Sequence, residues 1–539
     1  MPIDRRDFVR LGAGVLLGAG SARLQAQEQR TRPSMLKPLK DSGLRIEALM
    51  HTGQTFGTYQ PPGIMDGMGA WDWNATTVRL FVNHELQPNV GYRFLLANGT
   101  GLTGARISWI DIDKESRQIA DAGNAIREIR DRRGEIVTRP AQVSELWSEE
   151  TDKGLSNLCS AQGYRAGEFG FVDDILFSHE EVTSPERHPH GGTVWGLDVR
   201  SGQLWALPEL GRGAWENVTA IRTDDQDSDD GHIALLLSDD LEFGGAPLYL
   251  WIGRKKPGAG YVARNGLAEG QLHVWTSYKD DRDPGDWNGT GSVRSGRFVP
   301  VSTRTPASAG KEGFDRDGYV NDTGLRERAR EVGAFMFSRP EDLHTRRKTG
   351  TTAVFCSAGH GDRFPADDWG TIYLIDVRIV LNGDSPSATA RLTILHDGDD
   401  FGDFGIRSPD NVVWASDDMI YVQEDKATRR HEFGGESGRE TSTWIIDPEN
   451  PSAYRRIAEI DRSVVLPADA RDFAYMVHGA WECTGLIDVS QEFGAPADEL
   501  LLITAVQAHT IRGGSLGGRR NLFQGGQLVM LSAAKKPAG

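Results

Sequence analysis

The chain has 539 residues, of which 60 are Lys or Arg and 77 are Asp or Glu, so its formal charge is −17. A chain this acidic is repelled by phosphate backbones and by anionic membrane surfaces, which excludes a nucleic-acid-binding scaffold. Its 64 glycines lie well above the usual share of about 7% and favour many tight turns over many helices. Hydrophobic residues make up 38% of the chain, which is enough for a large core.

Residues 1–26 have the order of an export signal. Arg5 and Arg6 precede an apolar stretch over residues 11–20 and a small-residue region that ends near Ala26. This order is typical of a twin-arginine signal peptide, and the alternative is a basic amphipathic first helix. We therefore expect the twin-arginine export machinery as a partner and a periplasmic or secreted mature protein. No later run of about 20 apolar residues occurs, so no stable membrane insertion is expected.

Short runs rich in β-branched and aromatic residues alternate with turn-rich stretches along the rest of the chain. Helical periodicity is convincing near 325–332 and weaker near 142–148. The pattern predicts an all-β protein with few short helices. The predicted strands cover residues 77–83, 106–111, 174–178, 192–198, 232–238, 248–252, 272–275, 333–337, 352–356, 371–375, 390–395, 419–423, 442–446, 500–505 and 527–531.

The spacing of these strands favours one architecture. A strand that ends at Asp198, a turn that contains Gly202 and a return strand follow the usual punctuation of a propeller blade. We predict a single large β-propeller of six or seven blades over residues 27–539. At about 40 to 45 residues per blade, a chain of this length would contain more blades than an ordinary propeller has. We therefore expect long insertions between the strands, one of them near 254–322. The alternative is a protein of two β-sandwich domains.

Acidic residues gather at the ends of apolar runs instead of scattering over the surface. In a propeller, equivalent strand ends of different blades meet on one face of the central channel, so these clusters are placed to form one site. Convergent carboxylates stay ionised together only when cations hold them, because like charges at close range raise one another's pKa. Each cluster taken alone also fits a turn cap. The clusters are Asn83-His84-Glu85, His179-Glu180-Glu181, Glu216-Asn217, Asp239-Asp240, Arg339-Pro340-Glu341-Asp342, Glu424-Asp425 and Trp481-Glu482-Cys483.

The residue types in these clusters indicate which metals would bind. Oxygen-rich sites suit hard cations such as Ca²⁺, Mg²⁺, Mn²⁺ and ferric iron, and His179, His360, His478 or His509 could add nitrogen ligands. The cysteines, at 159, 356 and 483, are too few and too scattered for a disulfide framework or an all-thiolate site. Arg339 fits either a salt bridge or, in a metal-lined pocket, a bidentate clamp for phosphate.

Taken in order, segments of the chain resemble the motifs of the PhoX-type alkaline phosphatases, which are exported by the twin-arginine route and fold as a β-propeller. The resemblance spans most of the mature chain, and its Arg-Pro-Glu-Asp and Pro-Asp-Asn segments are the most specific. The matching segments are Asp66-Gly67-Met68-Gly69, Asn83-His84-Glu85, His179-Glu180-Glu181, Trp215-Glu216, Ser238-Asp239-Asp240, Arg339-Pro340-Glu341-Asp342, Ser408-Pro409-Asp410-Asn411, Glu424-Asp425, Glu482-Cys483-Thr484-Gly485 and Gln507-Ala508-His509.

In that family, iron and calcium ions share a carboxylate cage and act on phosphomonoesters. The resemblance implies a catalytic pair, Arg339 and Glu341, in which Arg339 holds phosphate. It implies calcium with iron or manganese as cofactors, and we expect no organic cofactor. The other candidate substrate-binding residues are His360 and His509. The candidate metal ligands are His179, Glu180, Glu181, Glu216, Glu341, Asp410, Glu424 and Glu482.

One segment departs from the family pattern. Where the family carries Cys-Glu-Glu, this chain has His179-Glu180-Glu181, so the expectation is that a thiolate ligand to iron is absent. Either His179 replaces it or the metal set differs, for example a binuclear Mn²⁺ or Ca²⁺ site. The second possibility would bring the chain closer to a metal-dependent phosphotriesterase.

The predicted function is metal-dependent hydrolysis of phosphate monoesters, in which bridged cations activate water and Arg339 stabilises the phosphoryl oxygens. The alternatives are a binuclear-metal phosphotriesterase, a calcium-dependent lactonase or esterase, and a non-enzymatic calcium-binding propeller. Arg339 argues against a lactonase because a neutral lactone needs no guanidinium clamp. We expect a monomer, since a large propeller is often complete as one chain.

Overall fold

The computed structural model describes residues 33–144, 153–184, 188–241, 244–382, 386–426 and 432–535, so the predicted export signal lies outside the described residues. In this part of the chain, strands far outnumber helices, which confirms the all-β prediction. The helix predicted near 325–332 is confirmed, and it begins where Asn321 Oδ1 accepts the Gly324 N–H at 2.8 Å. The α-helices of the described residues are α2 (Ala141–Ser144), α3 (Tyr261–Arg264) and α4 (Asp322–Glu331).

The larger sheets divide into six units, each running from an inner strand to an outer one, and their strands pair antiparallel except for β9 with β13. Unit 1 contains β3 (Met65–Asn74), β4 (Thr77–His84), β7 (Arg106–Asp113) and β8 (Ile119–Asn124). Unit 2 contains β10 (Leu158–Tyr164), β11 (Ile175–Glu180), β12 (Val194–Asp198) and β13 (Gln203–Ala206), with β9 (Glu128–Arg130) beside β13. Unit 3 contains β14 (Trp215–Ile221), β15 (His232–Asp239), β17 (Tyr249–Arg254), β18 (Gly270–Ser277) and β19 (Val293–Val301).

The remaining units complete the chain. Unit 4 contains β21 (Pro340–Thr345), β22 (Thr352–Ser357), β23 (Thr371–Val380) and β24 (Ser387–Asp397), and β24 pairs with β19 of unit 3. Unit 5 contains β25 (Pro409–Trp414), β26 (Ile420–Glu424), β27 (Ser442–Asp447), β28 (Asn450–Ile460) and β1 (Leu36–Pro38). Unit 6 contains β30 (Glu482–Asp488), β31 (Glu499–Ala508), β33 (Gly525–Ala534) and β2 (Arg45–His51). Short pairs are β5 (Phe94–Leu95) with β6 (Gly101–Leu102), β16 (Gly245–Ala246) with β20 (Phe337–Ser338), and β29 (Arg471–Asp472) with β32 (Ile511–Arg512).

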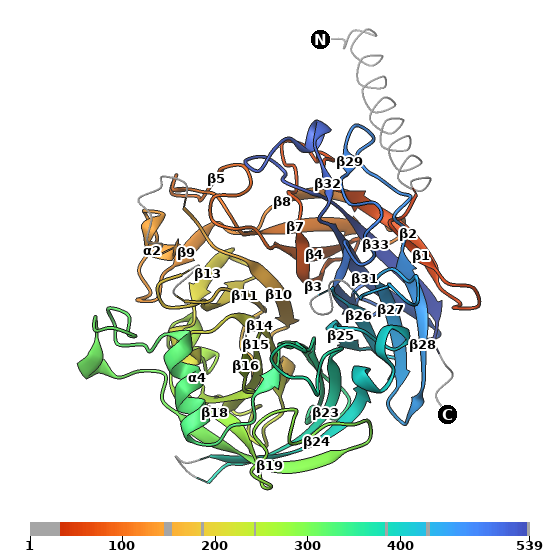
Figure 1. Cartoon of the computed structure of the whole chain (residues 1–539). Coiled ribbons are helices and arrows are strands. Elements are labelled where there is room, and N and C mark those ends of the chain that lie inside the picture. Colours follow the sequence, from red (N-terminus) through yellow and green to blue (C-terminus); the bar gives the residue numbers. More distant parts are fainter. Residues whose placement is uncertain are drawn as a thin grey trace, which may run out of the picture.

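The six units surround a common centre (Figure 1). The inner strands β3, β10, β14, β21, β25 and β30 contact one another in that order, and β30 returns to β3. Each pair of neighbouring units shares one large cluster of buried apolar side chains. The last interface, between units 6 and 1, is filled by residues such as Met65, Ile110 and Leu528. Because both faces of every sheet are covered, removal of apolar surface from water holds the ring together.

Strands from the two ends of the described chain close this ring. β2 pairs with β33, so unit 6 combines an early strand with the final one, and β1 adds to the edge of unit 5 through β28. Segment 254–322, which the sequence predicts to be an insertion, contributes β18, β19 and α3. Of the predicted strands, 333–337 is wrong except for Phe337, because the chain there forms the turn that follows α4. In the described part of the chain, no helix is both long and apolar enough to cross a membrane.

Every inner strand carries a β-bulge near its start. Three residues of the inner strand advance where its partner advances two, for example from Trp215 to Val218 against Asp239 to Leu237. The same shift occurs in the other five inner strands. A bulge breaks the strict alternation of side chains and re-aims the residues within it. Repeated six times, it re-aims side chains at one end of the ring.

Candidate metal centre and active site

We call one set of side chains the inner ring. It consists of one residue from each of five bulges, together with the first residue of β30. It contains four carboxylates from β3, β14, β21 and β25, one thiol from β10 and one carboxylate from β30. All lie at the starting ends of their strands. The inner ring is Asp66, Cys159, Glu216, Glu341, Asp410 and Glu482.

A second set of acids comes from the neighbouring strand of four units. Each follows the last residue of the second strand, which is antiparallel to the inner strand and therefore ends beside its start. These residues belong to the motifs found in the sequence, but only Glu181 is a predicted ligand among them. The set, which we call the outer acids, is Glu85, Glu181, Asp240 and Asp425.

The side chains form a continuous run of possible metal-ligand atoms. Three groups have ligand atoms within 4.8 Å of one another, and they share Cys159 and Glu216. Cys159 Sγ lies 3.5 Å from Asp66 Oδ2 and 3.6 Å from Glu216 Oε1. The groups are Asp66 with Glu85 and Cys159, Cys159 with Glu181 and Glu216, and Glu216 with Glu341 and Asp410.

The charges in this run are poorly compensated by the protein itself. Burial, and then repulsion from Glu341, raises the pKa of Glu216 well above its ordinary value. Burial and repulsion from Glu482 do the same for Asp410, and burial with repulsion from Asp66 raises the pKa of Glu85 to about 7. Bound cations would remove this penalty, so the electrostatics of the residues fit a metal centre.

Cys159 places a thiol among the possible ligand atoms, in contrast to the expectation that a thiolate ligand is absent. The thiol lies in the middle of the run, on β10, where residues 158 and 180 are paired in register. It therefore reaches the site from the strand adjacent to the His179-Glu180-Glu181 segment. Burial and the surrounding carboxylates raise the pKa of this thiol well above its ordinary value. Cys159 holds the bulge position in β10 that an acid holds in β3, β14, β21 and β25, and this equivalence follows only from the strand pairing.

Three candidate ligands lie elsewhere. His179 is buried, its Nδ1 lies 2.9 Å from the Ser160 carbonyl oxygen, and burial lowers its pKa to about 3. Glu180 accepts the Ser156 and Thr193 N–H groups and lies 3.7 Å from Arg132 Nη2. Glu424 is bound to Arg407. None of the three belongs to the groups of ligand atoms found among the described residues.

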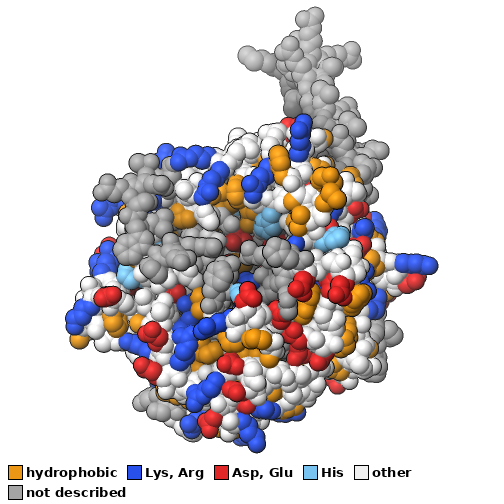
Figure 2. All heavy atoms as spheres, viewed as in Figure 1, with side chains coloured by type: hydrophobic (Ala, Val, Ile, Leu, Met, Phe, Trp, Pro, Cys, Tyr) orange, Lys and Arg blue, Asp and Glu red, His pale blue; other side chains and the backbone are white. Residues whose placement is uncertain are grey.

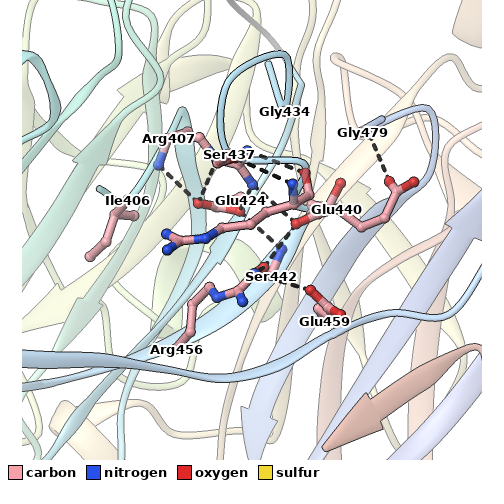
Figure 3. A network of polar contacts seen from close by, with 12 residues as sticks. Ile406, Arg407, Glu424, Gly434, Ser437, Glu440, Ser442, Arg456, Glu459 and Gly479 are labelled. Atoms are coloured by element: carbon pink, nitrogen blue, oxygen red, sulfur yellow. Dashed lines mark hydrogen bonds and ion pairs between the residues drawn. The ribbon is translucent and has the colours of Figure 1, made fainter. Parts of the chain in front are cut away.

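Figure 3 shows the hydrogen bonds and ion pairs that already engage the Glu424 carboxylate. Arg407 Nε and Nη2 donate to Glu424 at 3.1 and 2.8 Å, and the Ser442 N–H donates to it at 3.0 Å. Arg407 Nη1 also donates to Asp403 at 2.9 Å, and both Arg407 and Glu424 are fully buried. The carboxylate therefore completes a structural ion pair.

Three pairs of adjacent acids each combine one structural residue with one that faces the ring. The pairs are Glu180-Glu181, Asp239-Asp240 and Glu424-Asp425. Successive residues of a strand point to opposite sides, so only one of two adjacent acids faces the ring. The first acid of each pair meets a buried arginine, and the second belongs to the outer acids. The structural partners are Glu180 with Arg132, Asp239 with Arg326, and Glu424 with Arg407.

Replacing Arg407 by Leu is expected to lower the free energy of unfolding by about 3 to 5 kcal/mol, because Glu424 and Asp403 would be left buried without their partner. Urea unfolding measures the change. The matched control is Arg254→Leu, because Arg254 and Asp230 form an exposed pair, with side chains 54% and 60% accessible. That control should cost less than about 1 kcal/mol, and equal losses in the two variants would contradict a special role for the buried pair.

Arg339 adjoins the ring as a positive charge. Its Nε donates to Asp240 Oδ1 at 3.0 Å, its Nη2 also donates to Asp240, and Nη2 lies 3.3 Å from Glu341 Oε1. The residue has φ of 54°, a left-handed conformation that is strained for arginine, and its carbonyl accepts the Ala358 N–H at 2.9 Å. The backbone is thus held in a conformation that sets the guanidinium beside the acids.

The two remaining histidines differ in position. His509 Nε2 lies 2.9 Å from Glu482 Oε2, so His509 borders the inner ring. His360 lies in the turn after β22, where its N–H donates to the Asp367 carbonyl, and it belongs to none of the three groups of ligand atoms. A separate cavity of about 460 Å³ lies toward the far ends of the inner strands and is lined by residues such as Gln162, Trp414 and Asp488. No inner-ring residue lines that cavity.

A ring of β-sheets with buried carboxylates, a thiol and an arginine at one end fits the class of metal-dependent phosphoester hydrolases. The family model described as alkaline phosphatase PhoX matches residues 144–446. The chain belongs to the PhoX alkaline phosphatase family, whose members are phosphomonoesterases. This confirms the predicted resemblance and favours monoester hydrolysis over the triesterase and lactonase alternatives.

One solved structure is similar over nearly the whole chain. It is Pseudomonas fluorescens PhoX in complex with vanadate, a transition state analogue, with a TM-score of 0.58 and 16% sequence identity. The match covers 93% of this chain and 96% of that one. The comparison with curated proteins gave no match. Asp66, Glu85 and Glu482 lie outside the residues that the family model matches, so the three-dimensional structure is what joins them to the site.

Proposed function

We propose that this chain hydrolyses phosphate monoesters at a centre of several metal ions, calcium together with iron or manganese. The inner ring, with Glu85 and Glu181, would hold the ions. The observation that carries the proposal is the run of three overlapping groups that share Cys159 and Glu216. Carboxylate oxygens suit hard cations, and a thiol among them favours iron over calcium at that point of the run. When bound, such ions supply charge neutralisation and polarise the phosphoryl group.

Other side chains orient the ligands. Thr484 Oγ1 donates to Asp66 Oδ1, and Gln507 Nε2 donates to Asp66 Oδ2 at 2.7 Å. Asn157 Nδ2 donates to Glu85 Oε1 at 3.1 Å, and His509 fixes Glu482. Such partners set the direction of each carboxylate and reduce the reorganisation that binding requires.

Arg339 would hold the phosphate group of the ester. Its contacts to Asp240 and Glu341 use Nε and Nη2, and among the described residues no hydrogen bond uses Nη1. A guanidinium fixed in this way can donate to a non-bridging phosphoryl oxygen as negative charge grows there. Because the protein carries a charge of −17, a local positive group also helps an anionic ester to approach.

The proposal extends to the architecture and the location of the protein. The closed ring of six units supports a six-bladed β-propeller in which each unit is one blade. Closure of the ring by strands of the same chain supports a monomer. The order of residues 1–26 supports export by the twin-arginine route to the periplasm or beyond.

The test combines elemental analysis of the purified exported protein with hydrolysis of an aryl phosphate monoester and an aryl phosphate triester. We expect two or more bound metal ions per chain, turnover of the monoester, and loss of that turnover on treatment with a strong chelator. Restoring the metals should restore turnover, which controls for unfolding. Turnover that survives complete metal removal would contradict the proposal, and a preference for the triester would replace it with the triesterase alternative.

A further inference from the structure

An exposed apolar loop, residues 473–477, lies between β29 and β30, and β30 is the inner strand of unit 6. Phe473, Tyr475, Met476 and Val477 are 70%, 71%, 77% and 45% exposed. Single exposed apolar residues are common, but four within five positions form a patch that usually marks a contact surface. Figure 2 shows hydrophobic side chains gathered on the face that carries β29 and β32.

One partly buried arginine, Arg462, holds this loop. Arg462 Nη2 donates to Asp472 Oδ2 at 2.6 Å and to the Ala474 carbonyl at 2.8 Å, while its Nη1 donates to the Val477 carbonyl at 2.8 Å. The guanidinium also lies over the Trp481 ring, 4.6 Å from its centroid. Because both ends of the turn are tied to the same group, the apolar side chains are held in water and do not collapse onto the core.

The loop borders the inner ring on two sides. On one side, the Phe473 N–H donates to the carbonyl of Thr510 at 3.0 Å, and Thr510 follows His509, the partner of Glu482. On the other side, Lys426, which follows Asp425, donates through Nζ to the His478 carbonyl at 2.6 Å.

The chain leads directly from this loop into the site. Five peptide steps separate Val477 from Glu482, so their Cα atoms are at most about 19 Å apart. Beside the loop is a hollow of about 500 Å³ lined by Phe473, Thr510, Arg512 and Gly513.

We propose that residues 473–477 contact the organic group of the substrate and give the enzyme a preference for phosphate monoesters of bulky apolar alcohols. The inference rests on the proposed function. The phosphate end of an ester is drawn to the cations and Arg339, so the alcohol end points away from the acids and toward the rim. There the loop and the hollow beside Phe473 offer apolar surface, on which a ring can be removed from water.

The test compares phenyl phosphate with 2-naphthyl phosphate, which differ mainly in one additional apolar ring. We expect kcat/KM of the metal-loaded wild-type enzyme to be higher for the naphthyl ester. In the variant F473S/Y475S/M476S, the ratio of the two kcat/KM values should fall about five- to tenfold, mainly through KM, because the buried ring area is lost. The control is Tyr278→Ser, because Tyr278 is 60% exposed but follows the outer strand β18.

The outcomes separate the two proposals. All three altered side chains are largely exposed, so metal content and unfolding temperature should match those of the wild type. A variant that hydrolyses both esters with an unchanged ratio overturns the preference alone and leaves the phosphatase proposal standing. Inactivity of the metal-loaded wild type on both esters overturns both. A ratio that falls equally in the Tyr278→Ser control also overturns the role of the loop.

Discussion

Glu216→Gln is expected to abolish most of the phosphatase activity and to lower the number of metal ions bound per chain. Glu216 belongs to two of the three overlapping groups, so its loss interrupts the run of ligand atoms at its centre. Removal of outer partners of metal ligands typically costs 10- to 100-fold, so loss of this ligand should lower kcat/KM more than about 100-fold. Elemental analysis and steady-state kinetics on the same preparation measure both effects.

The metal-free proteins give a second readout of opposite sign. Burial together with Glu341 raises the pKa of Glu216, so without cations folding must either bury its charge among other acids or protonate it, and both cost stability at neutral pH. A neutral amide carries neither cost, so metal-free Glu216→Gln should unfold at a higher temperature than metal-free wild type.

Glu424→Gln is the matched control because Glu424 is equally buried but bound to Arg407. It should lose stability while the folded fraction keeps its metals. If Glu216→Gln retained the full metal content and activity, the inner ring would not be the metal centre.

Arg339→Lys is expected to reduce kcat/KM for phosphate monoesters by about 100- to 1,000-fold, the usual effect of removing one well-placed donor to a developing oxyanion. Lysine keeps the charge beside Asp240 and Glu341, but it cannot reproduce the two-pronged geometry of the guanidinium. The metal content should stay unchanged.

Inhibition by inorganic phosphate gives an independent measure of the same contact, and its inhibition constant should rise in Arg339→Lys. Arg326→Lys is the comparison, since Arg326 of α4 forms a buried pair with Asp239, the neighbour of Asp240 in unit 3. That change should lower stability and leave phosphate inhibition in the folded enzyme unaltered. Equal phosphate inhibition in wild type and Arg339→Lys would remove Arg339 from the substrate site.

The sequence predicted the outer parts of the sheets far better than the centre. Fourteen of the fifteen predicted strands coincide with observed ones, yet none of the six inner strands was among them. Each of these strands carries an acid or a cysteine at its first or second position, and two begin with proline, at Pro340 and Pro409. Their bulges also interrupt the alternation by which strands are recognised. The segments that bear the site are thus those in which function overrides local propensity.

The acids were found as clusters, but their individual roles depended on register. Sequence alone gives no reason to choose Glu181 over Glu180, because which of two neighbours faces the ring follows from strand pairing. Cys159 was missed for a related reason: it lies 22 residues from Glu181 in the chain, and only the pairing of β10 with β11 brings them together. His360 was proposed from its residue type, and no positional pattern supported it.

Closure of the ring depends on contacts between segments far apart in the chain. Thr484 donates to Asp66 across 418 residues of sequence, and β2 pairs with the final strand β33. Contacts of such long range form late, since a large loop must be ordered before they add any stability. A ribosome-bound chain that lacks unit 6 has neither Glu482 nor the partners that orient Asp66. The proposed metal centre would therefore be complete only once unit 6 has been synthesised and paired with β2.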